Sequence, residues 1–284
     1  MPRRLRWLTP YLFLVPGGLW LVAFFILPML AMSLVSLQTG SLGTGFELTW
    51  NFGVYPEVVE RWSTQIIRSL WYGVTVTALA LLLGYPIAYF IAFRGGRFKN
   101  ILLLMVILPF FTAFVIRTLN WRLILADNGF VVGTLKDLGL VDPGFHVIAT
   151  PLAVISGLTY NVLPFMILPL YVALEKIDPR LIEAAQDLYA GRLQAFRRVT
   201  LPLSMPGVFA GSLLVFIPAI GDFVNAALLG SRETTMIGNV IQRLFLQTNA
   251  YPEAAALSFV LMGLVLVLVA IYARGVGASN LTNG

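Results

Sequence analysis

The sequence predicts an all-α integral membrane protein with six transmembrane helices. Of its 284 residues, 58% are hydrophobic and 11% are charged, whereas soluble domains are typically about 45–50% apolar and about 25% charged. The mean hydropathy is +0.86. Apolar stretches of about 20 residues, the length that crosses a bilayer as a helix, occur at 11–37, 67–93, 101–125, 148–173, 206–229 and 254–273.

The distribution of Lys and Arg predicts that both termini are cytoplasmic. The N-terminal segment, the C-terminal tail and the connections after the second and fourth apolar stretches hold 12 of the 19 basic residues. Cytoplasmic loops of membrane proteins are enriched in Lys and Arg. We therefore attribute the net charge of +6 to this rule and to contact with membrane lipid, and expect no nucleic-acid partner. The first apolar stretch is longer than the core of a signal peptide and is expected to be retained.

Composition also excludes several kinds of functional site. The chain has no cysteine and a single histidine, His146, so disulfides, thiolate zinc sites and histidine-rich metal clusters are ruled out. None of the three lysines, Lys99, Lys136 and Lys176, follows a glycine. The GxxxxGK[ST] loop that binds nucleotide phosphates is therefore missing. We expect no catalytic residue, no cofactor and no metal in this chain.

The expected organisation has three parts. Residues 1–65 form an N-terminal transmembrane helix and an extracytoplasmic connection, residues 66–273 form the transmembrane core with a cytoplasmic loop at 174–205, and residues 274–284 form a cytoplasmic tail. The outward connections 38–66, 126–147 and 230–253 are too long for simple hairpins and contain aromatic and amphipathic stretches. We expect short interfacial or re-entrant helices in them.

The only sizeable predicted cytoplasmic loop contains the residues that typically begin a helix. Asp178 is placed to cap its N-terminus, and Pro179 follows at the first helical position, where its missing N–H does no harm. Apolar residues then recur at helical spacing, and the small side chains of Ala184 and Ala185 permit close approach of another surface. The residues alone leave two interpretations open, docking to another protein or packing on the chain's own bundle.

The same loop resembles a known motif. Glu183-Ala184-Ala185, Phe196 and the segment Val199-Thr200-Leu201-Pro202-Leu203 resemble the EAA motif of permease subunits of bacterial ABC importers, which have the type I, MetI-like fold. In that family the loop forms a coupling helix that sits in a cleft of the ATP-binding subunit. The resemblance implies that the following residues couple to the ATPase: Glu183, Ala184, Ala185, Asp187, Tyr189 and Gly191.

The sequence departs from that motif at one position. The family usually has glycine six residues after the glutamate, where a left-handed turn joins two short helices. Here that position is Tyr189, and the nearest glycine is Gly191. One interpretation is that the turn is displaced to Gly191.

Further segments are similar to the spermidine/putrescine subgroup of these permeases. They are Gly84-Tyr85-Pro86-Ile87-Ala88-Tyr89, Leu108-Pro109-Phe110-Phe111-Thr112, Leu163-Pro164-Phe165-Met166-Ile167-Leu168-Pro169, Ile220-Gly221-Asp222-Phe223 and Met236-Ile237-Gly238-Asn239. The resemblance implies half of a translocation path for a small solute, and the similarity to this subgroup implies a polyamine. The alternative is another small solute, such as an opine or iron, as in related subgroups. It also implies a second homologous permease, two copies of a cytoplasmic ATP-binding subunit, an extracytoplasmic solute-binding protein and a location in the bacterial inner membrane.

Asp222 is the one acidic residue inside a predicted span, just after Pro218 and Gly221. A carboxylate at that depth is costly and marks a functional position unless it is paired or capped. Three interpretations are open: a cation site on the path, a cap on a broken helix, or an ion pair with Arg117 or Arg122. Because carboxylates and aromatic faces suit a polyamine, the candidate path residues are Asp222, Phe111, Trp121, Tyr160 and Phe223.

Arg117 and Arg122 lie in the same outer region and would repel a polycationic solute. Unless they are paired or turned away, they favour an anionic or neutral solute.

Two other classes of protein fit less well. A secondary transporter is usually built from internal repeats with intramembrane acids, and neither is visible here. An intramembrane enzyme would need a nucleophile, base or ligand set that one histidine and no cysteine do not supply.

Overall fold

The computed structural model describes residues 9–281, and within them the chain is almost entirely helical. The predicted all-α class is confirmed, with one small exception. A two-stranded antiparallel hairpin pairs β1 (Gln38–Ser41) with β2 (Gly45–Leu48) in the register Gln38 to Leu48. The chain divides into two compact units, one formed by the chain up to Ser63 with Ile241–Leu264, the other by Thr64–Val240 with the chain from Val265.

The first unit contains the N-terminal apolar helices. α1 (Thr9–Leu21) and α2 (Leu27–Ser36) are joined by a π-helical turn at Val22–Ile26. The unit also holds the hairpin, the start of α3 (Val54–Arg94), the end of α12 (Ile237–Leu246) and the first half of α13 (Tyr251–Leu281). α3 is kinked at Trp62, whose φ of −111° and ψ of 17° are not helical.

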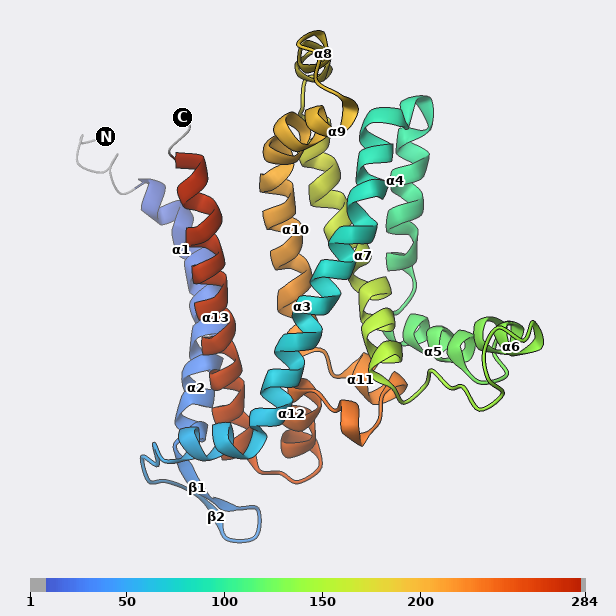
Figure 1. Ribbon diagram of the computed structural model, residues 1–284. Helices are drawn as coiled ribbons and strands as arrows, with labels where there is room; N and C mark the ends of the chain where they lie inside the picture. Colours follow the sequence, from blue (N-terminus) through green and yellow to red (C-terminus); the bar gives the residue numbers. More distant parts are fainter. Residues whose placement is uncertain (1–8, 282–284) are drawn as a thin grey trace. The chain divides into compact units, whose positions relative to one another are not determined.

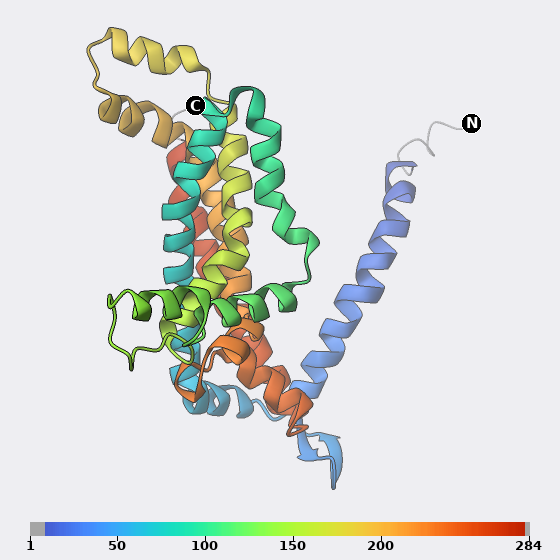
Figure 2. The ribbon, with the colours of Figure 1, turned by 90° about the vertical axis from the view of Figure 1, so that its right-hand side faces the viewer.

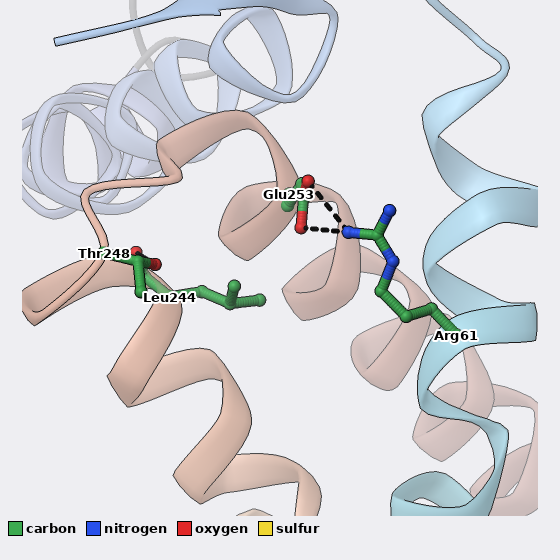
Figure 3. Close-up of polar contacts among 4 residues, drawn as sticks. All are labelled: Arg61, Leu244, Thr248 and Glu253. Carbon is green, nitrogen blue, oxygen red and sulfur yellow. Dashed lines mark hydrogen bonds and ion pairs between the residues drawn. The ribbon is translucent and has the colours of Figure 1, made fainter.

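An ion pair ties α3 to α13 inside this unit. One guanidinium nitrogen of Arg61, Nη1, donates to both carboxylate oxygens of Glu253 at 3.1 and 3.0 Å (Figure 3). Beside it, Thr248 Oγ1 donates to the carbonyl oxygen of Leu244 and closes the end of α12 at 3.1 Å. Both charged side chains are partly exposed, so the pair contributes at most about 1 kcal/mol.

The second unit is a helical bundle whose centre is the contact between α7 (Pro151–Glu175) and α10 (Leu201–Gly221) (Figure 1). Glycines on α10 let the two backbones approach closely. A Cβ on Gly207 would lie 2.7 Å from the carbonyl oxygen of Pro169, and one on Gly211 would lie 2.8 Å from Met166 Sδ. Small residues are the usual means of close helix packing in membranes. The remainder of α3 and α4 (Lys99–Ile107) complete the bundle.

Short elements lie at the two ends of this bundle. The remaining helices are α5 (Phe114–Leu125), α6 (Phe130–Asp137), α8 (Pro179–Asp187), α9 (Arg192–Ala195) and α11 (Val224–Leu229). Single 3₁₀ turns occupy Gly96–Phe98, Leu108–Phe111 and Arg232–Thr234, and a π-helical turn occupies Phe196–Thr200. Figure 2 shows α8 at one end of the bundle, with α5, α6 and α11 toward the other.

Five helices within the described residues are long and apolar enough to cross a membrane, at Phe13–Ser36, Val54–Arg94, Pro151–Glu175, Arg192–Gly221 and Tyr251–Arg274. A sixth candidate, Gly96–Phe111 with Phe114–Asp137, is bent by 96°. The predicted span over 101–125 is therefore not one continuous helix. Thr112 and Ala113 are extended, with ψ of 142° and 136°, directly after a turn that contains Pro109, and proline withholds a backbone donor from a helix.

The predicted span over 206–229 is also interrupted. Its helix ends at Gly221, Asp222 is extended with φ −65° and ψ 130°, and α11 begins at Val224. The break beside Gly221 agrees with the sequence, although Pro218 lies inside α10. Helices were also expected in the outward connections, and α6, α12 and the segment of α3 before its kink at Trp62 confirm this for all three.

Candidate functional site

The loop at the α8 end of the bundle is built as the sequence predicts. Asp178 caps α8, because its Oδ1 accepts from the backbone N–H of Arg180 at 3.0 Å, and Pro179 is the first helical residue. No residue of α8 is buried in this chain. Glu183, Ala184 and Asp187 are exposed and Ala185 is half-buried, so this surface is open to a partner.

The chain reverses after α8 through a Schellman turn centred on Tyr189. The N–H of Tyr189 donates to the carbonyl of Gln186 at 2.9 Å, and the N–H of Ala190 donates to the carbonyl of Ala185 at 3.1 Å. These are the two bonds that define the motif, and its left-handed position is usually glycine. Tyr189 occupies that position with φ +61°, whereas Gly191 has an ordinary φ of −64°.

The interpretation that the turn moves to Gly191 is therefore wrong. The hydrogen bonds that end α8 require the left-handed residue directly after Leu188, so Tyr189 adopts that conformation itself. For a residue with a Cβ this costs about 1–2 kcal/mol. The two hydrogen bonds of the turn act against this cost, whereas the Tyr189 side chain, which is 99% exposed, packs against nothing in the described part of the chain.

Both ends of the loop are attached to the bundle. At the end of α7, Glu175 Oε1 accepts from Lys99 Nζ of α4 at 2.6 Å. After α9, the ring of Phe196 lies edge-on to Tyr85 and Tyr89 of α3, with centroids 5.6 and 6.2 Å apart. Tyr85 also shares a hydrogen bond of 2.8 Å with Ser204 of α10. The loop that carries α8 is thus joined to α4 at one end and to α3 at the other.

A second set of polar residues lies at the break between α10 and α11. Asp222 Oδ1 accepts from the backbone N–H of Asn225 at 2.8 Å, and Asp222 Oδ2 accepts from Asn225 Nδ2 at 3.1 Å. The carboxylate therefore caps α11, which is one of the three interpretations left open by the sequence. Within the described part of the chain, no ion pair joins Asp222 to Arg117 or Arg122.

The cap continues into a buried network. Asn225 Oδ1 accepts from Asn161 Nδ2 of α7 at 3.0 Å and from Thr118 Oγ1 of α5 at 3.3 Å. Asn161 Nδ2 also donates to Thr118 Oγ1 at 3.1 Å. Thr118 and Asn225 are fully buried and Asn161 is 1% exposed. The network joins three helices at the point where the bundle is broken.

A cavity of about 400 Å³ adjoins this network. Its wall includes Asp222, Asn161 and Arg117, together with the phenyl rings of Phe110, Phe114 and Phe165. Arg117 is 9% exposed and its Cζ lies 5.4 Å from the ring centre of Phe110. Among the described residues, Asn161 Oδ1 and two guanidinium nitrogens of Arg117, Nε and Nη1, have no hydrogen-bond partner. The cavity thus combines oxygen acceptors and aromatic faces with one fixed positive charge.

The predicted path residues do not form one cluster. Trp121 and Tyr160 stack with ring centres 5.2 Å apart and planes inclined by 2°. Tyr160 contributes to another cavity, of about 520 Å³, whose wall is apolar and comes from α3, α4 and α7. Phe111 is 80% exposed and Phe223 is 40% exposed, and neither lines the cavity beside Asp222.

Sequence reasoning did not single out Thr118, Asn161 or Asn225. The available signal was weak, namely that Asn161 is an amide inside the predicted span 148–173 and that polar side chains at that depth need partners.

Comparisons with known proteins agree on one family. Residues 80–276 match the model of the binding-protein-dependent transport system inner membrane component family. The chain is 39% identical to the spermidine/putrescine transport system permease protein PotB of Haemophilus influenzae over 265 residues, covering 90% of each chain. It is 38% identical to the protein of the same name in Escherichia coli K12, covering 88% of this chain and 92% of that one.

Solved structures show the same fold. A bacterial alginate ABC transporter in complex with an alginate pentasaccharide-bound periplasmic protein superposes with a TM-score of 0.73, at 23% identity and 96% coverage of both chains. The inward-facing MetNI methionine ABC transporter superposes with a TM-score of 0.53, at 19% identity, covering 76% of this chain and 93% of that chain. The MetI-like permease fold is thereby confirmed.

Proposed function

The chain belongs to the family of binding-protein-dependent transport system inner membrane components, and from this premise we propose that it forms half of the translocation path of a polyamine importer. The observation that carries the solute class is the similarity to spermidine/putrescine permeases, at 39% identity over 90% of both chains. Members of this family work as subunits of ABC importers. This chain therefore functions together with a second permease, an ATP-binding subunit and an extracytoplasmic binding protein.

The energy for transport comes from the ATP-binding subunits, of which the assembly holds two copies. This chain has no phosphate-binding loop of the GxxxxGK[ST] type, and it hydrolyses no ATP. Its exposed α8 surface, with Glu183, Ala184, Ala185 and Asp187, docks on the ATP-binding subunit. Tyr189 and Gly191 belong to the same contact.

The excess of Lys and Arg supports a cytoplasmic location for the α8 end of the bundle and for both termini. The break between α10 and α11 then lies toward the outer face. A solute released by the binding protein reaches this end first.

The cavity beside Asp222 supplies the chemistry that a polyamine needs. The Asp222 carboxylate and the unpartnered Asn161 Oδ1 accept from ammonium groups. The rings of Phe110, Phe114 and Phe165 contact the methylene stem and add cation–π attraction. Phe111, Trp121, Tyr160 and Phe223 serve as further path contacts.

One observation favours a second candidate. The Arg117 guanidinium lines the same cavity and leaves two N–H groups without acceptors. A polyamine carries only donors, so it satisfies neither. An anionic or neutral small solute with acceptor oxygens would accept from these N–H groups. The alternative function is therefore import of such a solute by the same kind of permease.

The test is uptake by the reconstituted importer. The chain, its second permease and the ATP-binding subunit are placed in proteoliposomes with the binding protein outside and ATP inside. Accumulation of labelled putrescine or spermidine that depends on ATP supports the proposal. Vesicles that import a different solute but neither polyamine contradict it, whereas vesicles that import nothing with every partner bound contradict the permease function itself.

A further inference from the structure

Tyr189 combines two properties that are unfavourable in a free chain. Its backbone is left-handed, with φ +61°, a region that residues with a Cβ rarely adopt. Its ring is 99% exposed, so within the described residues no packing of the side chain adds to the two hydrogen bonds that hold the turn. Strained residues cluster at functional positions. A large exposed ring fixed on such a turn is available to a partner.

The residues around Tyr189 indicate the kind of partner. Leu188 and Leu193, which lie close to Tyr189 in the sequence, are 82% and 69% exposed. Around them the loop exposes charges of both signs, Glu183 and Asp187 as well as Arg180 and Arg192. Exposed apolar residues rimmed by charge are typical of protein interfaces. Because α8 is proposed to dock on the ATP-binding subunit, that subunit is the partner we assign to Tyr189, and contact with anionic lipid is an outcome that the test distinguishes.

We infer that Tyr189 is an aromatic anchor that enters a pocket of the ATP-binding subunit. The inference rests on the proposed docking of α8, but not on the identity of the solute. Buried Tyr side chains often dominate the affinity of an interface. The Schellman hydrogen bonds hold the turn before the partner arrives, and such preorganisation lowers the ordering cost of binding.

The experiment distinguishes the contribution of the Tyr189 ring to binding from that of the left-handed turn. The variants Tyr189→Gly, Tyr189→Ala and Tyr189→Phe are assembled with the second permease in nanodiscs, and binding of the ATP-binding subunit encoded beside this chain is titrated. Tyr189→Gly relaxes the turn yet removes the ring, so its affinity should fall at least about tenfold. Tyr189→Ala should fall as far, whereas Tyr189→Phe should stay within about threefold of wild type.

Several outcomes would overturn the inference. If Tyr189→Gly binds as tightly as wild type, the ring contributes nothing. If Tyr189→Gly weakens binding but Tyr189→Ala does not, stiffness of the turn is what matters. If the defect disappears in nanodiscs without anionic lipid, the ring contacts lipid instead. Polyamine uptake is measured separately, so a permease that binds its ATP-binding subunit through Tyr189 but imports another solute would contradict only the proposed function.

Discussion

Replacing Asp222 by Asn tests the role of the cap between α10 and α11. The wild-type carboxylate accepts two hydrogen bonds from Asn225, one from its backbone N–H and one from its side-chain amide. In Asp222→Asn the new oxygen can keep the backbone bond. The new amide nitrogen then faces Asn225 Nδ2, and two donors oppose each other.

Asn225 cannot resolve this conflict by flipping its amide alone. Its Oδ1 already accepts from Asn161 Nδ2 and Thr118 Oγ1, and a flip would lose both bonds. The variant therefore loses one charge-assisted hydrogen bond, worth about 1.5–3 kcal/mol. For a chain of this size, that loss corresponds to a Tm lower by about 3–12 °C.

A double variant provides the matched control. In Asp222→Asn with Asn225→Asp, the amide at 222 donates to the carboxylate at 225, which still accepts from Asn161 and Thr118. All hydrogen bonds of the network are restored while the charge moves by three residues. The double variant should recover at least half of the lost Tm, measured by thermal unfolding of the purified subunit in detergent.

Two results would refute this reasoning. Asp222→Asn with the wild-type Tm would mean that the cap contributes no stability. Rescue by Arg117→Gln, but not by Asn225→Asp, would mean that Asp222 pairs with Arg117 after all. Polyamine uptake by the same variants is read separately. If the double variant is stable yet transports poorly, the carboxylate at 222 acts on the solute.

The remaining predictions concern packing and energy coupling. Gly207→Ala should destabilise the α7–α10 contact by about 1–3 kcal/mol, because the new Cβ would lie 2.7 Å from a backbone oxygen. Gly263→Ala is the control, because nothing lies within 4 Å of its Cβ. Equal Tm values for the two variants would contradict the packing argument. Ala185→Trp or Glu183→Lys should abolish transport while the subunit keeps its Tm, and normal transport by both variants would show that α8 does not dock. The purified single chain should hydrolyse no ATP, and activity that survives removal of contaminating ATPases would disprove this.

Much of this protein could be predicted from its sequence because the deciding interactions are local. Apolar stretches longer than a bilayer is thick must be helical, since a lipid-exposed backbone can satisfy its hydrogen bonds only internally. The start of α8 is equally local: Asp178 reaches an N–H two residues away. The motif around Glu183 is contiguous, and it was sufficient to indicate the family.

Tertiary structure decided what depends on residues far apart in the chain. Asn161 meets Thr118, 43 residues away, and Asn225, 64 residues away, so no spacing in the sequence announces their network. The bend of 96° after Phe111 could not be predicted from Pro109 alone, because a proline is compatible with a straight transmembrane helix as well. Whether the helix is interrupted depends on its packing against neighbouring helices. At the end of α8 the sequence favoured Gly191 as the left-handed residue of the turn. The hydrogen bonds that end α8 instead require the left-handed residue directly after Leu188, so Tyr189 adopts that strained conformation.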